Sequence, residues 1–232
     1  MSQLIDKLEV KERLNLELVK ARLKPASLIS FGGAIFPFAY DAVFEGVYVK
    51  DLKIQNEQVK LLPEIISQFE SELTEFGVHH QENFSNSQTT YLFTSPPKPV
   101  FLELKIYAIA HSTEKLNNLL NAKSHEEKGL ALGFPKEDVE SYHKIINGQE
   151  RDGIYLCKSL GEAIKANVQV PSWLAYISFI PQHLDIVNGN ISVQSEELGK
   201  KYQAHIRKNN KTLAEEVEQE FLRERDSLIR YV

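Results

Sequence analysis

The chain has 232 residues, of which 42% are hydrophobic and 25% are charged. This composition is typical of a globular protein, and it excludes collagen-like, intrinsically disordered and disulfide-rich miniprotein classes. Lys and Arg number 27 against 32 Asp and Glu, so the formal net charge is −5. No net positive field therefore attracts nucleic acid or an acidic membrane.

The single cysteine, Cys157, excludes an internal disulfide and a multi-thiolate metal site within one chain. Asp6 and Lys7 interrupt the leucines of the N-terminus, which therefore lacks the apolar run of a secretory signal. No apolar stretch reaches the length of a membrane helix. We therefore expect a cytoplasmic protein with no membrane contact.

Helical spacing of apolar residues predicts a first helix over residues 3–23, which Pro25 ends. Residues 47–54 alternate with one phase slip, as in a bulged strand. Pro63 at the start and Gly77 at the end bound the clearest amphipathic helix of the chain.

Residues 78–84 and 88–94 flank the turn-prone Ser85-Asn86-Ser87, and residues 100–106 alternate after a proline cluster. This pattern predicts three antiparallel strands. Ser112 and Ser124 are predicted N-caps of two later helices. The apolar stripe from Ser195 onward predicts a long amphipathic helix over 195–231, or two helices with a break at Asn209-Asn210.

Together these elements predict an α+β protein: a small, mostly antiparallel sheet with covering helices, followed by a helical C-terminal half. We expect a single domain over residues 1–232. Its helix-plus-sheet part covers 1–111, and its mainly helical part covers 112–232.

Residues 124–139 have the pattern of a helix-turn-helix, with a small residue at Gly129 and a turn glycine at Gly133. The second helix carries Glu137, Asp138 and Glu140, and such acidic residues disfavour DNA binding. A zinc-protease site is excluded because the residue four after His125 is a glycine. We expect no metal and no cofactor.

The pair His125-Glu126 before the turn Leu132-Gly133-Phe134-Pro135 resembles prokaryotic, largely archaeal and clostridial, families of unknown function. In these families a His-Glu pair opens a helix before a Leu-Gly-Tyr-Pro turn. Phe179-Ile180-Pro181, followed by Ser195, Leu198, Gly199 and Tyr202, is similar to a related archaeal group with cysteines after the turn and after Phe-Ile-Pro. Those cysteines suggest a metal or redox site in the relatives. Here Glu137, Asp138 and Gln182 stand at the corresponding positions, so the thiol ligands are absent.

Two groups of residues are candidate binding sites. The first is a pocket near the His125-Glu126 helix start and the Phe179-Ile180-Pro181 segment, with His143 or His183 as acid/base partners. The second is a basic stretch, which an acidic block follows. The basic stretch consists of Lys200, Lys201, Arg207, Lys208 and Lys211. The two blocks can pair within one helical hairpin or between two chains.

His79 and His80 are neighbours on a predicted strand, so their side chains point to opposite faces and do not chelate one metal. Because no catalytic constellation is evident, the leading hypothesis is a non-enzymatic binding or scaffold protein that self-associates through its C-terminal helices or binds a protein partner. One alternative is a ligand-binding protein or enzyme with the His125/Glu126 pocket. Nucleic-acid binding through Lys200 to Lys211 is a less favoured alternative.

Overall fold

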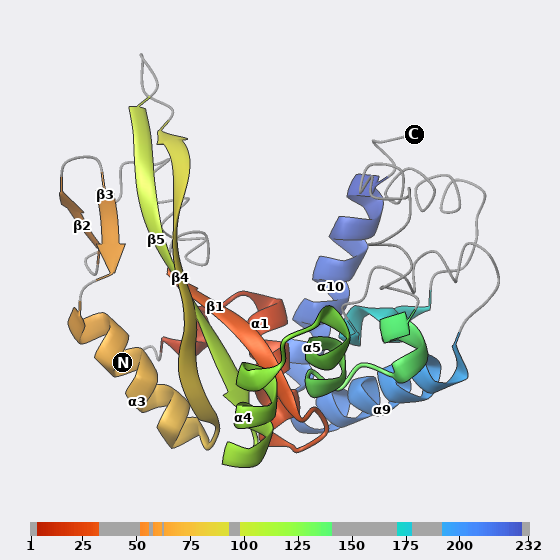
Figure 1. Ribbon diagram of the computed structural model, residues 1–232. Coiled ribbons are helices and arrows are strands. Elements are labelled where there is room, and N and C mark those ends of the chain that lie inside the picture. The colour runs from red at the N-terminus through yellow and green to blue at the C-terminus, as the bar shows by residue number, and fades with distance from the viewer. Residues whose placement is uncertain are drawn as a thin grey trace. The chain divides into compact units, whose positions relative to one another are not determined.

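The computed structural model describes residues 4–32, 52–55, 58–61, 63–92, 98–140, 171–177 and 192–228 (Figure 1). The chain divides into two compact units, Met1–Asn121 and Ala122–Val232. Every described strand lies in the first unit, and the described part of the second unit is helical. The protein is therefore α+β, as predicted. The single domain stays a prediction.

The first unit contains a five-stranded sheet built around its central strand, β5. The strands are β1 (Ala26–Gly32), β2 (Leu52–Gln55), β3 (Gln58–Leu61), β4 (His79–Leu92) and β5 (Lys98–Ala110). Their order is β1-β5-β3-β2, with β4 also paired to β5. Only β3 and β5 run parallel, so the sheet is mostly antiparallel, as predicted.

The prediction of a turn at Ser85-Asn86-Ser87 was wrong. These residues continue β4 and pair with residues 105, 104 and 103 of β5. The irregularity in β4 is instead a bulge between Glu82 and Phe84. Turn-prone residues are accommodated in a strand when a long partner supplies the hydrogen bonds, because strand propensity depends strongly on context.

The predicted helix over residues 3–23 is shorter. A 3-10 turn, η1 (Ile5–Lys7), precedes α1 (Val10–Lys20), and Leu8 between them is extended, with a ψ of 155°. The cause is tertiary: the backbone N–H of Ile5 donates to Glu72 Oε2 at 3.0 Å, and Ile5 and Leu8 enter the core.

Two helices begin or end as the sequence predicted. The first, α3 (Pro63–Phe76), is followed by Gly77 with a φ of +91°. The second, α4 (Thr113–Asn121), follows Ser112, whose Oγ accepts from the N–H of Lys115 at 3.3 Å. Gly77 is favoured there because a positive φ carries no steric cost for glycine.

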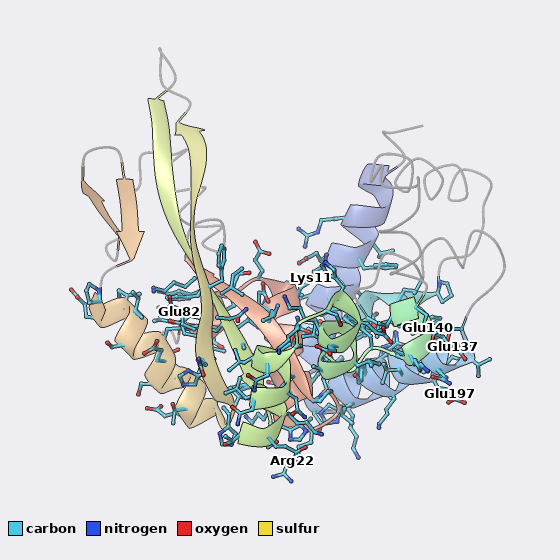
Figure 2. The ribbon with its side chains drawn as sticks, viewed as in Figure 1. Lys11, Arg22, Glu82, Glu137, Glu140 and Glu197 are labelled. Atoms are coloured by element: carbon cyan, nitrogen blue, oxygen red, sulfur yellow. The ribbon has the colours of Figure 1, made fainter. Side chains whose placement is uncertain are left out.

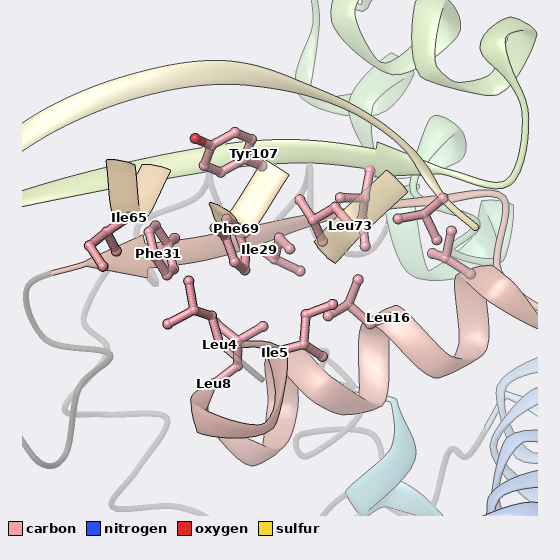
Figure 3. Close-up of a cluster of buried hydrophobic side chains, with 13 residues drawn as sticks. Leu4, Ile5, Leu8, Leu16, Ile29, Phe31, Ile65, Phe69, Leu73 and Tyr107 are labelled. Carbon is pink, nitrogen blue, oxygen red and sulfur yellow. The ribbon is translucent and has the colours of Figure 1, made fainter. Parts of the chain in front are cut away.

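The main core of the first unit lies between the sheet and η1, α1 and α3 (Figure 3). The rings of Phe31 and Phe69 stack with centroids 3.9 Å apart, and Tyr107 meets Phe69 edge to face at 5.4 Å. The buried cluster consists of Leu4, Ile5, Leu8, Leu16, Val19, Ile29, Phe31, Ile65, Phe69, Leu73, Val78, Tyr107 and Ile109.

The second unit contains α5 (His125–Ala131), the 3-10 turn η3 (Ser172–Tyr176), α9 (Val193–Asn209) and α10 (Lys211–Leu228). A single helix over 195–231 was the wrong alternative, because the helix breaks at Asn210. Asn210 has φ −145° and ψ 80°, and its side chain accepts from the N–H of Leu213 at 3.1 Å as an N-cap. In the described part of the chain, no helix combines the length and the apolar character needed to cross a membrane.

The end of α1 provides a stability test, because Arg22 has a φ of 57° (Figure 2). The N–H groups of Arg22 and Leu23 donate to the carbonyls of Val19 and Leu18, both at 3.0 Å. This is a Schellman ending, in which glycine normally occupies the position of Arg22. We expect Arg22→Gly to raise the free energy of unfolding by about 0.5–1 kcal/mol in urea titrations. Arg22→Ala is the control, and an equal gain from it would contradict the conformational explanation.

Candidate functional site

The candidate residues His125 and Glu126 lie in the first turn of α5, which begins with a capping box. Ser124 Oγ accepts from the N–H of Glu127 at 3.0 Å, and the Glu127 carboxylate accepts from the N–H of Ser124 at 3.3 Å and of Lys123 at 2.6 Å. These hydrogen bonds lower the pKa of the Glu127 carboxyl. His125 and Glu126 are exposed, and neither has a hydrogen bond or ion pair with another described residue.

The two helices around the turn at Gly133 are closely packed. Gly133 has a φ of +85°, and residues 136–140 form the start of the next helix. A Cβ at Gly129 would lie 2.8 Å from Val139 Cγ2, so any larger residue would require the helices or Val139 to shift. The expected packing of a small residue at Gly129 is confirmed.

A buried carboxylate joins this second helix to the start of α9. Asp138 is 2% exposed and Ser195 is fully buried, and Ser195 Oγ donates to the Asp138 carboxylate. Beside them, Ser192 Oγ donates to Glu137 Oε2 at 3.3 Å. The N-terminal end of the α9 dipole favours both negative charges. Figure 2 shows Glu137 on this side of the unit with Glu140 and Glu197.

Residues that carry the family resemblance meet at the same place. A Cβ at Gly199 would lie 2.4 Å from Trp173 Cε3, and the side chains of Tyr202 and Trp173 are buried. The buried face of α9 consists of Ser195, Gly199, Tyr202 and Ile206. These positions therefore build packing in the second unit. The family relationship itself stays a prediction.

Several residues of the predicted pocket lie outside the described residues. They are His143, His183 and the segment Phe179-Ile180-Pro181, and Gln182, which belongs to the family resemblance, also lies outside the described residues. The pocket at His125 and Glu126 therefore stays a prediction.

The basic stretch, which covers α9 and the first residue of α10, is partly paired with acids of the same chain. Lys200 Nζ lies 2.5 Å from Glu196 Oε1, and Lys211 Nζ lies 3.9 Å from Glu215 Oε1. Lys201 and Lys208 are exposed and have no acidic partner among the described residues. The positive charge available to a polyanion is therefore smaller than the sequence suggests.

Glu218 connects three elements of the second unit, η3, α9 and α10. It accepts from Arg207 Nε at 2.9 Å and lies 2.8 Å from Arg207 Nη2, which joins α9 to α10. The hydroxyl of Tyr176, on η3, donates to the same Glu218 oxygen at 2.8 Å. Burial, together with this carboxylate, raises the pKa of Tyr176. Of the two arrangements that the sequence left open, pairing within one hairpin is therefore present.

In the first unit, the side chains of His79 and His80 point to opposite faces of the sheet, as predicted. His79 Nδ1 lies 3.3 Å from Thr113 Oγ1 on α4, and His80 Nε2 lies 3.1 Å from Thr74 Oγ1 on α3. Burial lowers the pKa of His80. Nearby, the hydroxyl of Tyr107 donates to Glu70 Oε1 at 3.0 Å. These groups join α3 and α4 to the two sides of the sheet.

Sequence reasoning missed a pair of partly buried charges in the first unit, Glu12 on α1 and Lys24 before β1. Burial raises the pKa of Glu12 to about 7, although the N–H of Ser30 donates to its Oε1 at 3.3 Å. Burial lowers the pKa of Lys24 to about 8, and its Nζ donates to Asn15 Oδ1 at 2.8 Å. Both groups can exchange protons near neutral pH. No spacing rule identifies them, because both shifts arise from tertiary burial.

Among the described residues, no three His, Cys, Asp or Glu side chains are close enough to hold a metal ion. No protein-family model, curated protein or solved structure matches the chain.

The Glu12 carboxyl predicts a pH dependence of stability. Between pH 4.5 and about 7 the folded protein holds a proton at Glu12 that the unfolded chain has lost. Stability therefore falls as the pH rises through this window. We expect the free energy of unfolding to decrease from pH 5 to pH 7.5 by about 1–3 kcal/mol less in Glu12→Gln than in the parent, measured by urea unfolding at both pH values. An unchanged slope in this variant would contradict the assignment, and exposed Glu114→Gln is the control.

The contact of Gly199 with the ring of Trp173 predicts a second stability effect. Gly199→Ala places a methyl group against the indole, which must shift. We expect a loss of about 1–3 kcal/mol in the free energy of unfolding. Trp173 is the chain's only tryptophan, so its fluorescence reports the displacement directly. Ala204→Ser, at an exposed position of the same helix, should leave both readings unchanged. A stable Gly199→Ala with the parent's emission spectrum would refute the packing.

Proposed function

We propose that the protein is a non-enzymatic binding or scaffold protein that self-associates. The observation that carries this proposal is the outer edge of β4, the edge that faces away from β5. Among the described strands, this 14-residue strand pairs only with β5. An unpaired strand edge presents backbone donors and acceptors that readily bind a further strand.

The polar side chains of the described residues also support binding over catalysis. Asp138 with Ser195, Glu218 with Tyr176 and Tyr107 with Glu70 each link separate elements of a unit. Groups used in this way hold the fold together. Glu12 and Lys24 have the pKa values of an acid/base pair, but among the described residues no cluster of His, Cys, Asp or Glu that could hold a metal ion accompanies them.

The two alternative functions have less support. The exposed His125 and Glu126 contact no other candidate group among the described residues. In the basic stretch, the ion pairs of Lys200, Arg207 and Lys211 reduce the charge that would attract a nucleic acid. Self-association needs neither a pocket nor a positive surface.

Sedimentation equilibrium and native mass spectrometry of the full chain test this proposal. We expect a dimer that dissociates on dilution, with a dissociation constant on the order of micromolar. A monomer at concentrations up to about 100 µM would refute self-association, because a contact weaker than that is not a stable assembly. Additional mass retained on each subunit would favour the ligand-binding alternative.

A further inference from the structure

We propose that residues 84–92 of β4 pair antiparallel with the same segment of a second copy. The two sheets would then continue into one another across a two-fold axis. This inference rests on the proposed self-association and identifies its surface.

The pairing of β5 determines which edge is available. β4 pairs along all of β5, from His79 opposite Ala110 to Leu92 opposite Lys98. β1 and β3 pair with separate parts of β5, so they share its other edge. The described strands therefore leave the outer edge of β4 unpaired over its whole length.

The two ends of β4 differ in how well they are protected from pairing. Natural edge strands are protected by bulges, lysines, prolines and other charged residues. The first part of β4 has the bulge at Asn83 and the charged Glu82, which pairs with Lys105 at 2.6 Å. Residues 84–92 read Phe-Ser-Asn-Ser-Gln-Thr-Thr-Tyr-Leu, with no proline and no charged residue. This second part is therefore the one suited to pairing.

Among the described strands, few pair with β5 on its other edge beside the second part of β4. Beyond Leu104, where the described register of β1 ends, the described residues that pair with the other edge of β5 are those of β3, opposite Phe101 and Leu102. Figure 1 shows this end of the β4–β5 hairpin extending past the rest of the sheet. A two-stranded hairpin is marginally stable in water, and a third strand stabilises it.

A second copy is the partner that this segment fits. An antiparallel strand is complementary in hydrogen bonding to its own copy, and a two-fold contact closes after two subunits. When residues 84–92 of the two copies overlap over their whole length, Gln88 lies at the two-fold axis. Ser87 then lies opposite Thr89 of the second copy. Because the segment is neutral, no like charges meet.

The C-terminal helices are a weaker surface for the second copy. Their opposite charges already pair within the chain, where Arg207 contacts Glu218. An intermolecular pairing of the same blocks would have to break these contacts, and it would gain little because exposed ion pairs contribute little free energy.

A charge exchange across the axis tests the proposal. Ser87→Lys/Thr89→Lys and Ser87→Glu/Thr89→Glu each place like charges opposite one another in a dimer of one variant. Sedimentation equilibrium at low salt should show dimerisation at least about fivefold weaker for each variant alone. An equimolar mixture of the two should regain dimerisation, because opposite charges then face each other. Matching circular dichroism spectra and melting temperatures establish that both variants remain folded.

The control places the same charges on α10, as Gln219→Lys and Gln219→Glu at an exposed position. Unchanged dimerisation in these variants, together with rescue in the β4 mixture, supports the β4 contact. If the wild-type chain dimerises and both β4 variants dimerise equally well, the β4 contact is refuted, while self-association stands. If only the Gln219 variants weaken dimerisation, the β4 contact is refuted and the dimer contact lies on the C-terminal helices. If the wild-type chain is a monomer, both proposals fail.

Discussion

The pairing of β5 along both of its edges is the constraint on which the first unit depends. It holds β4 on one side and β1 and β3 on the other, so strands distant in sequence have a fixed register. Within β5 the side chains alternate between faces. Tyr107 and Ile109 belong to the core with α1 and α3, while the intervening Ala108 and Ala110 are also fully buried. Both faces of the sheet are therefore covered at this end.

In the second unit, the close approach of neighbouring elements at glycines determines the packing. In the first unit, strand pairing does so. Gly129 and Gly199 each stand where a methyl group would overlap a neighbouring side chain. A buried Asp138 and the shared carboxylate of Glu218 then satisfy polar groups that this close packing encloses. Ser195, Gly199 and Tyr202, three of the positions on which the predicted resemblance rests, lie on the buried face of α9, which relates them to packing more directly than to chemistry.

Local signals in the sequence predicted the elements that local interactions determine. The caps at Ser112, Ser124 and Gly77 were recognisable because each acts within one turn of its own helix. Two other features were missed because distant partners determine them: β1 owes its extended conformation to β5, and the break after Leu8 follows the contact of Ile5 with Glu72. For the candidate sites, the charges of α9 were identified but not their partners, and no pattern indicated Glu12 and Lys24.

The pair Glu12 and Lys24 has a consequence for the heat of folding. Below neutral pH, folding takes up a proton at Glu12, whereas between about pH 8 and 10.5 it releases one from Lys24. A buffer must supply the first proton and absorb the second. The calorimetric enthalpy of unfolding should therefore depend on the ionisation enthalpy of the buffer, with opposite sign on the two sides of neutrality.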